Sequence, residues 1–229
     1  MALSTLYASP KARWIVVDGI STLDNRAYTD FLAAHVREHL PDREIVATSQ
    51  PWMQGIRGPE ILEALQTKKP LPYDWILQNR SAHIDAVVIP GLEQGKIIIQ
   101  RRGPYSTFAF DRVEKIEREN RLSLHNRMQD PHAVLILDAP AETIYQKLVE
   151  DHAAKGHPLD DLQNLEALTA AREEFLQMQR YFPRHPIHFV DVRYEDVPAL
   201  QRRILEIIQP TLDGVVRRTS DTSEPIDIK

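Results

Sequence analysis

Five short apolar runs, each followed by a longer helical stretch, constrain the fold of this chain more than any other feature of its sequence. The runs are nearly continuous and rich in β-branched residues, which is typical of strands buried on both faces of a parallel sheet. They are Trp14–Asp18, Glu44–Thr48, Lys96–Gln100, His132–Asp138 and Ile187–Asp191. Strand–helix–strand repeats predict right-handed crossovers and helices on both sides of the sheet. The expected class is therefore a three-layer α/β fold around a parallel five-stranded sheet.

The intervening stretches predict helices with recognisable ends. They are Arg26–Leu40, Pro59–Leu65, Tyr73–Gln94, Ser106–Met128, Ala141–Ala154, Leu162–Tyr181 and Val197–Ile208. Pro59 suits the first turn of a helix, Gly91 and Gly95 are expected to close the third, and Pro210 is expected to end the last. The chain turns polar at Asp213. This change predicts a single domain over residues 1–212 and a flexible tail over residues 213–229.

Composition narrows the classes of function. With 229 residues, 42% hydrophobic and 27% charged, the chain has the balance of one globular domain. Its net charge of −5 provides no basic field for nucleic acid or an anionic membrane, so neither is an expected partner. It has no cysteine, and no segment approaches the roughly 20 apolar residues of a membrane span. We expect a cytoplasmic protein.

Short motifs stand at the ends of the predicted strands. The first strand ends in Val16-Val-Asp-Gly-Ile20 directly before a helix, where P-loop nucleotide-binding proteins carry their phosphate cradle. Thr48-Ser-Gln-Pro51 follows the second strand, Asn79-Arg80 lies in the third helix, and Leu137-Asp-Ala-Pro140 closes the fourth strand. In this order the motifs resemble those of thymidylate kinases, which are P-loop nucleoside monophosphate kinases. The resemblance implies a P-loop NTPase-like fold.

The resemblance also implies an acceptor site for a nucleoside monophosphate or a related phosphorylated small molecule. Arg57, Arg80 and Arg102 stand where the family has arginines that hold the monophosphate. Planar guanidinium groups suit phosphate oxygens because they donate hydrogen bonds in pairs. The alternative is that these are surface arginines paired with helix carboxylates.

A second group of residues matches the part of the family's pocket that receives a pyrimidine base. Ser106 and Thr107 supply hydroxyl groups and Phe110 supplies a ring. Asp111 stands where the family has an amide, and a carboxylate cannot donate a hydrogen bond to a thymine carbonyl. If a nucleotide binds here, its base need not be thymine.

The predicted donor-phosphate loop departs from the family. Counted without gaps from Gly19, the family's P-loop lysine falls on Asn25 and its magnesium-binding hydroxyl on Arg26. The lysine neutralises the β and γ phosphates and the hydroxyl holds Mg²⁺, so both functions lack their usual group. Asp24 replaces a glycine and would repel a triphosphate. The Walker A motif is therefore degenerate.

Charge is also reversed at the end of the third strand, where Arg101 replaces the family's carboxylate. Asp18 and Asp138, at the ends of two other strands, are either magnesium-side groups or loop caps, and both interpretations stay open. The histidines show no metal-ligand spacing, so no metal site is predicted.

Two functional hypotheses follow. The first is a thymidylate kinase-like nucleotide-binding protein that has lost or reduced phosphoryl transfer. The second is an active nucleoside monophosphate kinase in which Arg26 or Arg101 replaces the missing charge and Arg102 assists transfer, as a fixed guanidinium can. ATP and Mg²⁺ are expected only if kinase activity is retained. We favour the first, because no lysine lies between Lys11 and Lys68.

The resemblance further implies a homodimer. The family pairs through the helices that flank the third strand, and the corresponding stretches of this chain carry apolar rows. These include Ile76, Ile84, Val87, Val88 and Ile116. A two-fold pair is also the commonest oligomer symmetry.

Overall fold

A computed structural model describes residues 10–20, 25–67, 69, 71–110, 130–155, 159, 163–193 and 196–214. The five strands form one sheet in the order β2-β3-β1-β4-β5, and every neighbouring pair is parallel. The strands are β1 (Arg13–Gly19), β2 (Ile45–Ser49), β3 (Ile97–Arg101), β4 (Ala133–Asp138) and β5 (Ile187–Asp191). The predicted parallel five-stranded sheet is confirmed.

Burial across the sheet follows the position of each strand. All seven residues of β1 are buried, and β3 and β4 are buried except at their last residue. The edge strand β2 is only half-buried, because one of its sides lacks a neighbouring strand. The apolar runs therefore predict the burial of the central strands better than that of the edges.

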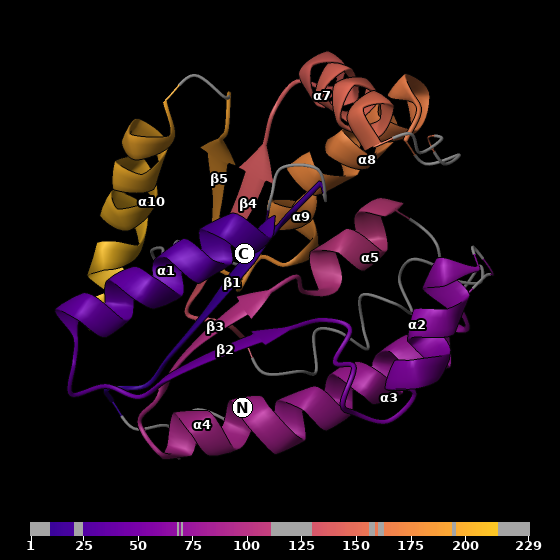
Figure 1. Cartoon of the computed structure of the whole chain (residues 1–229). Helices are drawn as coiled ribbons and strands as arrows, with labels where there is room; N and C mark the ends of the chain where they lie inside the picture. The colour runs from indigo at the N-terminus through magenta and orange to yellow at the C-terminus, as the bar shows by residue number, and fades with distance from the viewer. Residues whose placement is uncertain are drawn as a thin grey trace, which may run out of the picture.

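Helices cover the sheet and gather beyond one of its ends. Their bounds are α1 (Asn25–His39), α2 (Gly58–Gln66), α3 (Tyr73–His83), α4 (Ile89–Glu93), α5 (Pro104–Phe110), α7 (Ala141–Lys155), α8 (Leu165–Leu176), α9 (Met178–Tyr181) and α10 (Val197–Leu212). In Figure 1, α1 crosses the strands, and α2, α3, α5, α7 and α8 surround the end of the sheet toward which the arrows point. The carboxyl ends of parallel strands are where α/β proteins bind ligands.

The predicted helix Tyr73–Gln94 is continuous but not regular. A π-helical turn, η3 (Ile84–Val88), separates α3 from α4. Pro90 follows it and has no N–H to donate to the preceding turn, which favours such a local change of pitch. Gly95 has a φ of 76° and follows the end of α4, as its predicted closing role requires.

Two predictions need correction. Ile76, Ile84 and Val88 lie in the core of the protein, so they cannot form an apolar face for a second copy of the chain. Pro210 does not end the last helix, since α10 continues through it to Leu212. Pro210 has no N–H to donate to the carbonyl oxygen of Glu206 one turn earlier, and the helix continues for only two residues beyond it.

Some predictions fall outside the described residues. These are the helix beyond Phe110, including Ile116, and the tail after Gly214. Within the described part of the chain, no helix is long and apolar enough to cross a membrane.

Candidate functional site

A cavity of about 440 Å³ opens at the carboxyl ends of the strands. Its volume falls in the range of small-molecule sites, and its walls combine apolar side chains with a few polar groups, as such sites usually do. The positively charged residues that line it are Arg80, Arg101 and Arg102, and the apolar ones include Met53, Ile76 and Phe110. No Asp or Glu of the described residues lines this cavity.

Arg80 is a buried cation in the wall of the cavity. Its Nη2 atom donates to the carbonyl oxygen of Gly103 and to the hydroxyl of Thr107, both at 3.2 Å. Burial lowers the pKa of Arg80 to about 10, while Tyr73, Asp18 and Tyr105 oppose the shift. The guanidinium therefore stays charged at neutral pH and joins α3 to the start of α5.

Backbone strain marks two of the predicted phosphate-binding arginines. Arg57 and Arg102 have φ values of 62° and 64°, and they are the non-glycine residues with positive φ in the described part of the chain. Residues other than glycine adopt a positive φ only at an energetic cost, and residues with such strained backbones cluster at functional sites. Hydrogen bonds hold Arg102 in place, from its own N–H to Val17 O at 2.8 Å and from Gln100 Nε2 to its carbonyl oxygen at 2.6 Å.

Arg57 takes a different position from the other two arginines. It does not line the cavity, and its Nη1 atom lies 3.2 Å from a carboxylate oxygen of Glu60. Its guanidinium also lies 5.3 Å from the ring centroid of Trp75, within the range of a cation–π contact. Thus Arg80 and Arg102 meet at one site, whereas Arg57 has the helix carboxylate partner that the alternative interpretation predicts.

Asp18 is buried beneath the cavity and stabilises the start of α5. Its carboxylate accepts hydrogen bonds from the backbone N–H groups of Gly103 at 2.8 Å and Ser106 at 3.2 Å, and also from the Ser106 hydroxyl. The Gly19 N–H donates to it at 2.9 Å. Burial raises the pKa of Asp18, and the hydrogen bond from Ser106 and the charge of Arg102 oppose this effect. Asp18 therefore acts as a loop cap.

Asp138 is also engaged within the protein. Its two carboxylate oxygens accept from Nε and Nη2 of Arg172 in α8, at 2.8 and 3.0 Å. This two-pronged pair raises the pKa of Arg172. In the described part of the chain no group of three or more His, Asp or Glu side chains could hold a metal ion.

The described residues of the donor loop are bonded to one another. The Asn25 side chain is buried, and its Nδ2 atom donates to the carbonyl oxygen of Gly19 at 3.2 Å. Gly19 has a φ of 136°, and a β-carbon there would lie 2.5 Å from Leu137 O, so no larger residue fits. Arg26 has a side chain that is 77% exposed, lies 3.7 Å from Asp30, and does not line the cavity. Residues 21–24 lie outside the described residues.

The residues predicted to meet a base share the cavity with the arginines. Ser106, Thr107 and Phe110 all line it from α5. Phe110 packs edge-on against Phe175, with ring centroids 6.1 Å apart. Asp111 lies outside the described residues.

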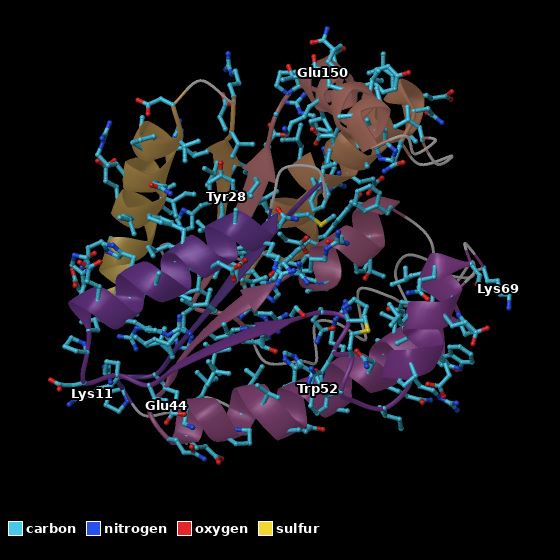
Figure 2. All side chains as sticks on the ribbon, in the orientation of Figure 1. Lys11, Tyr28, Glu44, Trp52, Lys69 and Glu150 are labelled. Atoms are coloured by element: carbon cyan, nitrogen blue, oxygen red, sulfur yellow. The ribbon has the colours of Figure 1, made fainter. Side chains whose placement is uncertain are left out.

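Sequence reasoning did not assign a role to Asn79. This buried amide accepts from Trp52 N and donates to Trp52 O and Ile56 O, each at 2.8 Å, so it holds the loop that leads to Arg57. Trp52 is labelled beside α3 in Figure 2. No periodicity distinguishes such an asparagine from a surface one, and its motif position next to Arg80 was the only available signal.

A buried histidine was also missed. His83 lies between Thr48 and the cavity residue Gln50, with its Nε2 2.7 Å from Thr48 Oγ1 and its Nδ1 2.9 Å from Gln50 Nε2. Since the amide nitrogen donates, Nδ1 accepts and Nε2 carries the proton. Burial and the charge of Arg80 lower the pKa of His83 to about 4, so the ring is neutral.

Comparison with known proteins agrees with the geometry. Residues 30–202 match a family model described as thymidylate kinase. The chain is 26% identical to a probable thymidylate kinase of Thermococcus kodakarensis over 58% of this chain and 62% of that protein. It is 26% identical to a thymidylate kinase of Janthinobacterium over 86% of this chain and 96% of that protein. The fold resembles a thymidylate kinase structure from Ehrlichia chaffeensis, with a TM-score of 0.64, 18% identity, and coverage of 86% and 99% of the two chains.

Proposed function

The chain belongs to the thymidylate kinase family, and from that premise we propose that it is a nucleotide-binding protein whose phosphoryl transfer is lost or strongly reduced. The observation that carries the proposal is the contrast between the two halves of the site. Arg80 and Arg102 line the cavity together with Ser106 and Phe110. Asn25 and Arg26, which stand at the positions of the family's donor-loop lysine and hydroxyl, do not line this cavity.

The acceptor half supports binding of a phosphorylated small molecule. Guanidinium groups are suited to phosphate oxygens, and a cavity wall shields such contacts from water better than an open surface does. The family binds nucleoside monophosphates, which matches an arrangement of arginines beside hydroxyl groups and an aromatic ring. We therefore expect a nucleoside monophosphate or a related phosphorylated molecule in this cavity.

The donor half argues against efficient transfer. Asn25 has no charge to neutralise a phosphate, its amide nitrogen donates to the carbonyl oxygen of Gly19, and the residue does not line the cavity. Arg26 extends into solvent beside Asp30, where screening weakens its attraction for a distant anion.

Magnesium, which the family normally uses with ATP, does not fit the described residues. One oxygen of Asp18 accepts from the N–H of Gly19 and the other from the N–H of Gly103, and both oxygens of Asp138 accept from Arg172. Mg²⁺ requires oxygen ligands that are free to face it. A guanidinium such as that of Arg101 repels a metal ion.

The alternative is an active kinase with displaced machinery. Arg101 favours it, because this side chain lines the cavity and a guanidinium can stabilise a transferring phosphoryl group. Arg26 would have to change its side-chain conformation to contribute.

A coupled assay of ADP release decides between the two. It is run with ATP and magnesium across the common nucleoside and deoxynucleoside monophosphates. The proposal expects turnover orders of magnitude below the roughly 1 to 100 s⁻¹ of typical kinases. Magnesium-dependent turnover near the lower end of that range, abolished by Arg26→Ala or Arg101→Ala, would establish the active kinase instead.

Binding is measured separately by thermal shift with nucleoside mono-, di- and triphosphates. A ligand that binds only the folded state raises the apparent melting temperature. The proposal expects a shift with a phosphorylated nucleoside in the absence of turnover, and it fails if none of these ligands produces one.

The homodimer also remains a proposal, without the apolar row first expected to form it. Among the described residues of that row, Val87 on η3 is half-buried and the others are buried. Light scattering over a concentration series tests the assembly, and a monomer at every concentration would contradict it.

A further inference from the structure

The buried side chain of Gln100, in β3, makes a hydrogen bond with each half of its amide group. Its Oε1 atom accepts from the indole Nε1 of Trp14 at 3.1 Å, and its Nε2 atom donates to the carbonyl oxygen of Arg102 at 2.6 Å. An indole N–H can only donate and a carbonyl oxygen can only accept, so these two partners fix the orientation of the amide. Trp14 is close enough because Val16, two residues further along β1, pairs with Gln100, and residues two apart share a face of the sheet.

The peptide group before Arg102 is held by backbone contacts alone. The carbonyl oxygen of Arg101 accepts from Gln50 N at 2.9 Å, and the N–H of Arg102 donates to Val17 O at 2.8 Å. Both contacts lie at the carboxyl end of the sheet, where β3 stands between β1 and β2. This peptide group is therefore fixed by the strands on either side of it.

The peptide group after Arg102 is held by two side chains instead. Gln100 donates to its oxygen, and Asp18 accepts from its N–H, which is that of Gly103, at 2.8 Å. The residue that follows is a glycine, whose backbone adopts many conformations, so without these bonds the peptide group would rotate easily. The planes of two successive peptide groups determine φ and ψ of the residue between them. Gln100 thus helps to hold Arg102 at its φ of 64°.

Gln100 does not line the cavity of about 440 Å³, whereas Arg102 does. Any effect of Gln100 on a ligand in this cavity must therefore pass through a neighbouring residue. A change of φ at Arg102 would turn its side chain about the N–Cα bond and direct the guanidinium elsewhere. The contact between Gln100 and the carbonyl oxygen of Arg102 opposes such a change.

We propose that Gln100, oriented by Trp14, is a positioning residue for the acceptor site. It fixes the peptide group that follows Arg102 and thereby keeps the guanidinium directed into the cavity. The effect on a bound nucleoside monophosphate rests on the proposed function. The effect on the backbone of Arg102 does not.

A double-mutant cycle measured by isothermal titration calorimetry tests the effect on the ligand. Gln100→Met removes both hydrogen bonds with little change in side-chain size, and it should weaken binding of a nucleoside monophosphate at least about tenfold. In the Arg102→Gly background the same change should weaken binding less than about twofold, because the guanidinium that Gln100 positions is absent. A merely structural role would weaken binding by the same factor in both backgrounds.

Urea unfolding without ligand tests the effect on the backbone. With Gln100 present, Arg102→Gly should unfold at a higher urea concentration than Arg102→Ala, since only glycine adopts a positive φ without cost. In the Gln100→Met background residue 102 is free to leave the positive region. The difference between the two unfolding midpoints should then fall by at least about half, as expected for coupled residues.

Two further variants complete the design. Trp14→Phe removes only the bond that orients the amide, so it should give the same pattern at a smaller size, and it serves as the second test if Gln100→Met does not fold. Gln209→Met is the matched control, because the Gln209 amide donates to Asp213 on the exposed side of α10. This control should change neither the affinity nor the difference between midpoints. Circular dichroism establishes that each variant is folded.

The outcomes separate this inference from the proposed function. Unchanged affinity in Gln100→Met, an equal loss of affinity in both backgrounds, or an unchanged difference between midpoints would overturn the inference and leave nucleotide binding intact. If the parent protein binds no nucleotide, the proposed function fails and the urea midpoints alone decide. A reduced difference would then support the positioning of Arg102 by Gln100, and an unchanged difference would overturn it.

Discussion

The carboxylate of Asp18, at the end of β1, accepts the backbone N–H of Gly103 at 2.8 Å across 85 positions of the sequence. This contact fixes the segment that joins β3 to α5, which carries Arg102 on one side and Ser106 on the other. The sequence alone did not decide whether Asp18 is a magnesium ligand or a loop cap. In the structure Asp18 holds the segment that forms one wall of the cavity.

Replacement of Asp18 by asparagine should destabilise the protein strongly. The amide group keeps one acceptor oxygen and places a donor against the N–H groups of the Gly103–Ser106 segment. The free energy of unfolding, measured by urea denaturation, is expected to fall by about 2 to 4 kcal/mol. Asp138→Asn is the matched control, and it should cost only about 1 kcal/mol because its pair with Arg172 is partly exposed. Equal losses of unfolding free energy in the two variants would contradict this role of Asp18 as a loop cap.

Backbone strain at Arg102 predicts an unusual order of stability. Arg102→Ala and Arg102→Gly both remove the guanidinium, but only glycine adopts a φ of 64° without cost. The glycine variant should therefore be more stable than the alanine variant by about 1 kcal/mol in urea unfolding. Both should lose affinity for a phosphorylated nucleoside by about 1.5 to 3 kcal/mol. An alanine variant as stable as the glycine variant would show that the backbone is not strained.

Arg80 should combine a binding role with a structural one. Arg80→Ala removes the donor to Gly103 O and Thr107 Oγ1, so it should lower the free energy of unfolding by about 2 to 4 kcal/mol as well as weaken ligand binding. Arg80→Lys keeps the charge without the planar fork and should recover only part of both. Calorimetry and urea unfolding give the two quantities. Full recovery by lysine would mean that only the charge of Arg80 matters.

His83 predicts a loss of stability on mild acidification. Its pKa is about 4 in the folded protein and near 6.5 when unfolded, so between these values the unfolded chain binds the additional proton. The stabilising contribution is complete above pH 6.5, falls as the pH drops, and is lost once the pH has passed through 4. Between pH 7 and 5 the free energy of unfolding should fall by up to about 2 kcal/mol from this residue.

The variant His83→Gln provides the control for that prediction, since it cannot be protonated. Urea unfolding at pH 7, 6 and 5 should show a shallower loss in the variant than in the parent. Burial lowers the pKa of His132 to about 4 as well, so some pH dependence should remain in His83→Gln. Identical slopes in parent and variant would mean that folding does not lower the pKa of His83.

Local and repetitive information in the sequence determined the class and layout of the fold. Apolar runs such as Lys96–Gln100 predict buried parallel strands because they are short, nearly continuous and rich in β-branched residues. The end of the third strand was likewise visible as an arginine-rich motif. The sequence also showed that Asn25 and Arg26 cannot supply a lysine charge and a magnesium-binding hydroxyl, since side-chain chemistry does not depend on conformation.

Only the tertiary structure decided which of the candidate side chains meet. Arg57, Arg80 and Arg102 are equivalent in a sequence, yet Arg57 pairs with Glu60 while the other two line the cavity. The apolar row containing Ile84 and Val88 could have faced a partner or the core, and packing placed both in the core. Asp18 caps the loop that follows β3 because the sheet order brings β1 next to β3. These outcomes depend on contacts between residues far apart in the chain, which no local pattern specifies.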